Sequence, residues 1–119
     1  MAQHVGIDLA DVEEVRASVV AQGERYLARV FTDSERRHSD GRIERLAAQF
    51  AAKEATMKAL RCEDRLPWRS IEVATDATGT ASLALHGPAA RVARERGVGE
   101  LVLSLTRTSW HAAAVVVAR

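Results

Sequence analysis

Two carboxylates stand where an apolar residue is expected, and they are the first candidates for chemistry. Glu54 lies four residues after Phe50 and three before Met57, so it continues the apolar stripe of a predicted helix. A carboxylate there must be paired, hydrogen-bonded or bound to a cation, because burying it alone costs several kcal/mol. Asp8 lies in a short apolar strand pattern just after Gly6, which would let another backbone or a ligand come close. Two such carboxylates are typical of a magnesium site completed by water and substrate phosphates.

Lys53 and Lys58 flank Glu54 and are the only lysines among 17 basic residues. The heavy use of arginine elsewhere indicates a GC-rich genome, so two retained lysines are candidates for a required role. As compact point charges they would contact the phosphates of a metal-bound substrate. Residue spacing also allows a second interpretation, in which Glu54 forms an ordinary i,i+4 ion pair with Lys58 and Asp8 faces solvent from an edge strand. Phosphoryl-type chemistry is the hypothesis we carry forward.

Other catalytic and binding motifs are absent from the sequence. The four histidines have no metal-ligand spacing, and a single cysteine excludes a zinc cluster. No Gly-rich phosphate loop of the Walker or Rossmann type occurs. Ser104 and Ser109 lack the Gly-x-Ser-x-Gly elbow of a nucleophilic serine. A nucleophile, if the reaction needs one, would come from a partner molecule.

The composition predicts one globular domain over residues 1–119, because hydrophobic residues make up 47% and charged residues 28%. A net charge of +1 gives no general attraction to nucleic acid. The longest apolar run, residues 112–118, is far shorter than the roughly 20 residues of a membrane span, so we expect neither nucleic acid nor a membrane as partner. Cys62 cannot form an internal disulfide, and the first residues lack the features of a signal peptide, so a cytoplasmic protein is expected.

The elements that would position the candidate residues follow from apolar periodicity and turn residues. Alternating apolar residues predict strands at 4–10, 68–75, 80–85, 98–106 and 110–118. Helical spacing and capping residues predict helices at 11–22, 24–30, 40–60 and 87–97, and the Thr32-Asp33-Ser34-Glu35 capping box predicts a further short helix. This order predicts an α+β domain, with an antiparallel-rich sheet packed against the long helix 40–60.

Several motifs follow one another in an order that resembles a known family. Gly-Ile-Asp occurs at residues 6–8, Phe-Thr-x-x-Glu at 31–35 and Phe-Ala-Ala-Lys-Glu-Ala-x-x-Lys-Ala-Leu at 50–60. The remaining motifs are Trp68 before Ile-Glu-Val at 71–73, Leu-His-Gly at 85–87 and Ser-Leu at 104–105. In this order and at this length, the chain resembles the holo-acyl-carrier-protein synthases, the short type of 4′-phosphopantetheinyl transferase.

The resemblance implies the 4′-phosphopantetheinyl transferase fold and a specific reaction. Such enzymes transfer the phosphopantetheine arm of coenzyme A to a serine of an apo acyl carrier protein and release adenosine 3′,5′-bisphosphate. By the resemblance, Asp8 and Glu54 would hold magnesium against the coenzyme A diphosphate. Glu54 would also help to deprotonate the serine, Lys58 would contact the phosphates, and Lys53 would lie close by.

The resemblance further implies that Ser104 and Arg107 bind coenzyme A, and that the chain is a homotrimer with coenzyme A in clefts between subunits. Three positions depart from the family pattern, because Glu14 and Gln49 replace an arginine and Arg107 replaces a histidine. Glu14 would repel an acidic carrier protein. Two functions therefore stay open. One is an active transferase that serves a polyketide or other secondary-metabolism carrier, and the other is a non-catalytic homologue that binds a carrier or stabilises an assembly.

Overall fold

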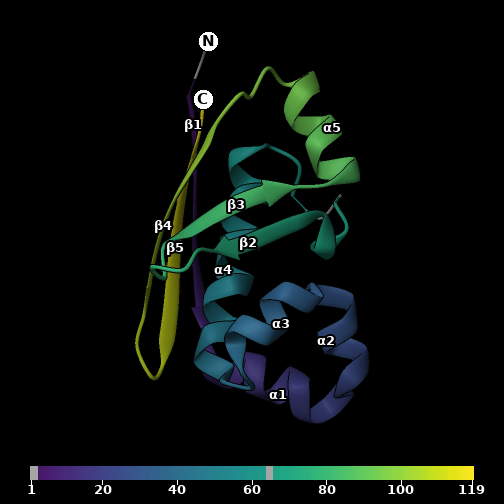
Figure 1. Ribbon diagram of the computed structural model, residues 1–119, viewed down its shortest axis with the longest axis vertical. Helices are drawn as coiled ribbons and strands as arrows, with labels where there is room; N and C mark the ends of the chain where they lie inside the picture. The colour runs from purple at the N-terminus through teal and green to yellow at the C-terminus, as the bar shows by residue number, and fades with distance from the viewer. Residues whose placement is uncertain (1–2, 64–65) are drawn as a thin grey trace.

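The computed structural model describes residues 3–63 and 66–119, and its elements follow the predicted order (Figure 1). The first half contains β1 (His4–Asp11), α1 (Val12–Gln22), α2 (Glu24–Val30), α3 (Asp33–Ser39) and α4 (Ile43–Ala59). The second half contains η1 (Trp68–Ser70), β2 (Ile71–Thr75), β3 (Ala81–Leu85), α5 (Gly87–Glu95), β4 (Leu101–Arg107) and β5 (His111–Ala118). The predicted α+β class is confirmed.

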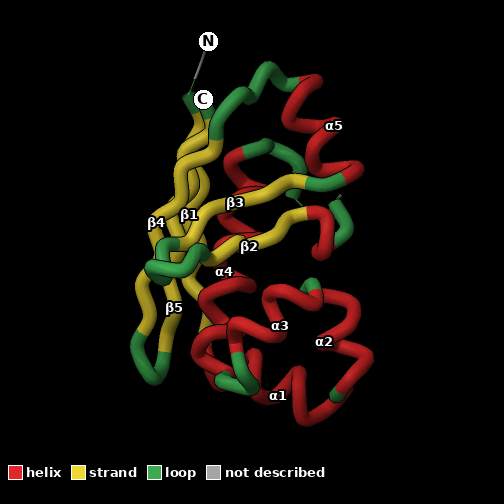
Figure 2. Tube along the Cα trace, in the orientation of Figure 1, coloured by secondary structure: helices red, strands yellow, loops and turns green. Residues whose placement is uncertain are grey.

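The strands form two antiparallel sheets, whereas the element order had predicted one. A three-stranded sheet has the order β1-β5-β4, and a separate hairpin pairs β2 with β3. The strands are yellow in Figure 2, where the hairpin crosses in front of α4 and its turn reaches the longer strands. The helix α4 packs against strands of both sheets, and β3 of the hairpin also contacts β4.

The helix α4 and the three-stranded sheet approach each other closely because their facing residues are small. From β5 the sheet presents Ala112, Ala114 and Val116, all buried. At Gly6 in β1, an added Cβ atom would lie only 1.9 Å from the backbone oxygen of Ala55 in α4. Only glycine allows this approach, which brings the backbone of β1 against the half of α4 that carries Glu54 and Lys58.

The helix α4 begins three residues later than predicted, at Ile43 instead of residue 40. Asp40 and Gly41 both have positive φ angles, of 49° and 72°, and a left-handed pair cannot continue a right-handed helix. Asp40 instead ends α3 as its C-cap. In the described parts of the chain, no helix has the length and apolar character needed to cross a lipid bilayer.

The sheet face away from α4 is apolar and uncovered in the single chain. Val5, Ile7 and Leu9 alternate along β1 and are 61%, 64% and 68% exposed. Val102 of β4 and Val115 of β5 extend this surface across the sheet. A monomeric soluble protein rarely exposes a contiguous apolar surface of this kind, so the face is a candidate subunit interface.

Candidate active site

The predicted site residues Asp8 and Lys58 are in direct contact. The Lys58 ammonium donates to Asp8 Oδ1 at 3.1 Å and to the Ile7 carbonyl at 3.0 Å. The Asp8 side chain is only 11% exposed, because the alternation of β1 turns it toward α4. The hydrogen bond to Asp8 raises the pKa of Lys58, and the nearby Glu54 charge adds to the effect. Asp8 therefore does not face solvent from an edge strand.

Glu54 shares an open stripe of α4 with Lys58. Between Leu46 and Ala59 every residue of this helix is buried except Phe50, Glu54 and Lys58, which follow one another at intervals of four and are partly exposed. Glu54 and Lys58 line one small cavity of about 30 Å³ with Met57, Glu63 and Trp68. The sequence pattern placed Glu54 on a buried apolar stripe of the helix. In the structure its stripe is instead the partly exposed one, and the other residues between Leu46 and Ala59 are buried.

The donor set around Lys58 suits a hard cation that also binds phosphate. Asp8 Oδ1 already pairs with the positively charged ammonium of Lys58, so the Asp8 carboxylate is placed to bind a cation. Among residues 3–63 and 66–119, no group of three or more His, Cys, Asp or Glu side chains could hold a metal ion. A cation at Asp8 and Glu54 would therefore need further ligands from water and substrate, which is how magnesium is usually held in phosphate-transfer sites.

Lys53 does not lie with these residues, although the sequence placed it near the phosphates. Its side chain is completely buried on another side of α4, and its ammonium lies 2.8 Å from the Glu35 carboxylate. It also donates to the carbonyl oxygens of Trp68 and Ile71. Burial lowers the pKa of Lys53, and the Glu35 charge opposes this shift. The Lys53 ammonium is therefore buried in the interior of the domain, where it does not reach the predicted phosphate site.

Glu35 is the buried ion-pair partner of Lys53, and the sequence pattern did not predict this pair. The predicted capping box forms: Thr32 accepts from the Glu35 backbone, and Glu35 Oε1 accepts from the Thr32 backbone at 2.8 Å. The second oxygen, Oε2, accepts from the Val73 backbone at 2.7 Å. The carboxylate therefore joins α3, α4 and β2. The capping box was visible in the sequence, but nothing there indicated that its glutamate would be fully buried.

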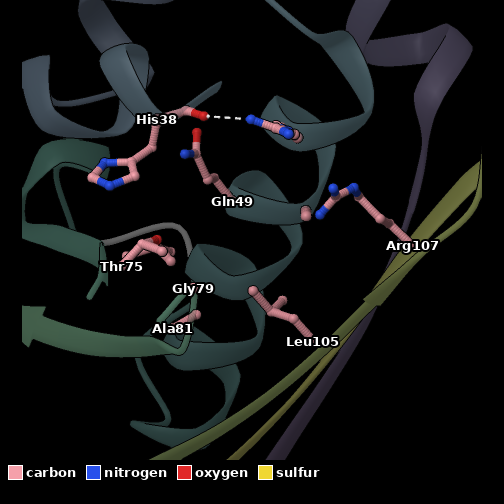
Figure 3. Close-up of a pocket in the computed structure, with 10 residues that line it drawn as sticks. His38, Gln49, Thr75, Gly79, Ala81, Leu105 and Arg107 are labelled. Atoms are coloured by element: carbon pink, nitrogen blue, oxygen red, sulfur yellow. Dashed lines mark hydrogen bonds between the residues drawn. The ribbon is translucent and has the colours of Figure 1, made fainter. Parts of the chain in front are cut away.

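Ser104 and Arg107 lie on opposite sides of β4, and neither contacts Asp8 within one chain. Ser104 is exposed on the sheet face away from α4, next to Val115 of β5. Arg107 lines a larger cavity of about 330 Å³, between α4, the end of α3 and the β2–β3 hairpin, shown in Figure 3. Within one chain, Ser104 and Arg107 therefore lie apart from the Asp8–Lys58 pair.

The cavity in Figure 3 is positively charged. Arg45 and Arg107 line it together with His38, and Arg45 is held by a hydrogen bond of 3.1 Å to the His38 carbonyl. Gln49 lies between them, where its amide nitrogen donates to the Glu35 carbonyl at 2.9 Å. Two guanidinium groups facing one cavity make it suitable for an anionic group such as phosphate.

Comparisons with known proteins agree with this geometry. Residues 4–115 match a family model described as the 4′-phosphopantetheinyl transferase superfamily. The chain is 42% identical to the holo-acyl-carrier-protein synthase of Moorella thermoacetica over 116 residues, which cover 92% of this chain and 88% of the relative. It is 41% identical to that of Anaeromyxobacter dehalogenans over 114 residues, which cover 93% and 88%.

Two solved structures have the same fold. The Chronobacterium ammoniagenes ACPS–CoA complex matches with a TM-score of 0.86 and 32% identity, over 100% of this chain and 98% of that one. The Neisseria meningitidis holo-acyl-carrier-protein synthase matches with a TM-score of 0.87 and 28% identity, over 98% and 97%.

Proposed function

The chain belongs to the holo-acyl-carrier-protein synthase family of 4′-phosphopantetheinyl transferases, and we propose that it transfers the phosphopantetheine arm of coenzyme A to an apo acyl carrier protein in a magnesium-dependent reaction. The observation that carries this proposal is the joint position of Asp8, Glu54 and Lys58, where β1 meets the open stripe of α4. The intact trio favours turnover over the alternative of a non-catalytic homologue.

Each member of the trio has a distinct task. Asp8 and Glu54 are the carboxylates that would hold magnesium. When bound, the ion would neutralise the charge that builds on the leaving group. Lys58 reaches the same point from α4 and would hold a phosphate oxygen of coenzyme A. Glu54 would also take the proton of the incoming serine, directly or through water. The serine oxygen then forms a bond to the attacked phosphorus, and adenosine 3′,5′-bisphosphate leaves with the electrons of the broken phosphorus–oxygen bond.

The nucleotide end of coenzyme A would be held by the final hairpin. Arg107 and Arg45 supply two guanidinium groups to the cavity in Figure 3, which suits a phosphate of the leaving nucleotide. Since these groups do not contact Asp8 within one chain, a complete site would be assembled from two subunits. Ser104 lies on the exposed apolar sheet face and would contact the ligand from a neighbouring copy. Because Cys62 is a buried free thiol, we expect the protein in the cytoplasm.

The apolar face of the three-stranded sheet needs a partner, and the family resemblance implies three copies, so the protein should be a homotrimer in solution. Light scattering after size-exclusion chromatography should give three times the mass of the chain. Val5→Glu, which places a charge on a side chain 61% exposed on this face, should yield monomers. The matched control Val20→Glu, on a side chain 81% exposed on α1, should leave the trimer intact. A monodisperse wild-type monomer would contradict this arrangement.

Transfer itself can be measured by the mass of the carrier. The protein is incubated with magnesium, coenzyme A and a panel of apo carriers of the fatty-acid and polyketide types. At least one carrier should gain the mass of one phosphopantetheine group, and a carrier whose acceptor serine is replaced by alanine should gain none. The carrier type that reacts fastest tests the proposed role in polyketide or other secondary metabolism. No mass increase on any carrier would favour the non-catalytic alternative.

A further inference from the structure

Lys53 is a buried charged residue that the proposed mechanism does not use. Its side chain and that of Glu35 are both completely buried, and the two charges lie 2.8 Å apart. Taking two charges out of water is costly, and replacing both members of such a pair by apolar residues often costs no stability. The stability of the domain alone therefore does not explain why a lysine stands at this position. Its other contacts indicate a second role.

The Lys53 ammonium holds the short turn η1 against α4. It donates to the Trp68 carbonyl at 3.1 Å and also to the Ile71 carbonyl. Trp68 begins this turn, and the backbone N–H of Ile71 closes it by donating to the same Trp68 carbonyl. The two bonds from one ammonium, which has three donors, thus fix the first residue of the turn and the residue after it relative to α4.

The indole of Trp68 is the part of this turn that reaches the candidate active site. The ring stacks on Phe50, with centroids 5.0 Å apart and an angle of 27° between the planes. It lines the cavity of about 30 Å³ that Glu54 and Lys58 also line. Trp68 is therefore held at two points, since Lys53 binds its backbone from a buried side of α4 and Phe50 packs on its ring at the open stripe.

We propose that Lys53 is a positioning residue that holds the Trp68 indole as a wall of the active site. The inference rests on the proposed transferase function, which it deepens by giving a role to a lysine that lies outside the site. An aromatic wall excludes water from the charged groups beside it, and their interaction with a phosphate becomes stronger in this less polar environment. A displacement of about 1 Å in such a site can lower the rate by up to about a hundredfold.

A double-variant cycle on transfer to a reactive carrier tests whether Lys53 acts through Trp68. Lys53→Met and Trp68→Leu should each lower kcat/KM by roughly tenfold. The double variant should be no slower than Trp68→Leu alone, because the wall is then already lost. Effects that multiply in the double variant would overturn the proposal. A kcat/KM of Trp68→Leu near that of the wild type would also overturn it, even if Lys53→Met did not fold.

Glu35→Gln is the matched control within the same ion pair. It removes the charge that faces Lys53 but leaves the lysine nitrogen as a donor to both carbonyls. Both Lys53→Met and Glu35→Gln should unfold at a lower urea concentration than the wild type, yet only Lys53→Met should lose activity. An equal loss of kcat/KM in Glu35→Gln, compared at the same folded fraction, would show a merely structural role and overturn the proposal.

The position of the indole can be followed without turnover, by fluorescence. The chain has two tryptophans, and Trp110 is 66% exposed, so Trp110→Phe leaves Trp68 as the only tryptophan. Its emission should shift to longer wavelength in Lys53→Met, as water gains access to the ring, and should not change in Glu35→Gln. Unchanged emission in Lys53→Met would overturn the proposal whether or not the protein transfers phosphopantetheine. The expected shift, together with no transfer by the wild type to any carrier, would overturn the transferase function and not the positioning of Trp68.

Discussion

Asp8→Ala and Glu54→Gln should each lower kcat by at least about a hundredfold, because each removes a carboxylate that would hold the metal and thereby several kcal/mol of charge stabilisation in the transition state. The rates are measured as transfer of the phosphopantetheine group to a reactive carrier at saturating coenzyme A. Glu95→Gln, which removes the same charge from an exposed position on α5, should react at the wild-type rate. A rate near that of the wild type in either site variant would refute the metal assignment.

The same two variants should fold normally, which separates a chemical loss from a structural one. The substitution Asp8→Ala removes an ion pair with Lys58, whose side chain is 37% exposed. Partly exposed ion pairs contribute at most about 1 kcal/mol to the free energy of unfolding. Glu54 lies on the open stripe of α4, where an amide of the same shape is accommodated. Thermal unfolding followed by circular dichroism should therefore show only small shifts of Tm.

Lys53→Met should lower the free energy of unfolding by about 3–5 kcal/mol, because it leaves the Glu35 carboxylate buried without its cation. Both side chains are 0% exposed, so water cannot compensate for the lost ion pair. The Trp68 and Ile71 carbonyls also lose a donor. The change is measured by urea unfolding, compared with Arg94→Met at an exposed position of α5, which should have little effect.

The double variant Glu35→Gln/Lys53→Met shows whether the ion pair causes this loss. If the uncompensated charge dominates, the double variant should be more stable than the sum of the two single changes predicts, by up to about 3 kcal/mol of coupling free energy. Additive effects in the cycle, or a loss below about 1 kcal/mol in Lys53→Met, would show that the pair contributes little.

Local sequence patterns were sufficient to predict most of the elements. The alternation of Val5, Ile7 and Leu9 predicted β1, but it left open whether Asp8 faces solvent, and only the structure shows Asp8 on the side of α4. The capping box at Thr32 predicted where α3 begins. These features depend on residues close together in the chain, so the sequence carries them directly.

The surroundings of α4 could not be predicted in the same way. The sequence assigned one buried stripe to this helix, but sheets on two sides and α3 enclose it almost completely, so the open stripe of Phe50, Glu54 and Lys58 is the exception. Which side of a helix a neighbouring element covers depends on tertiary packing.

Lys53 was placed near the phosphates because it adjoins Glu54 in the sequence, whereas successive helical residues point about 100° apart.

Calorimetric titration of coenzyme A into the protein tests the metal site most directly, since it needs no carrier. With magnesium present, the wild type should bind coenzyme A at least about tenfold more tightly than with a chelator. Asp8→Ala and Glu54→Gln should show no such dependence on magnesium. Equal affinity of the wild type with and without magnesium, or magnesium-dependent binding that survives in Asp8→Ala, would contradict a cation held by Asp8 and Glu54.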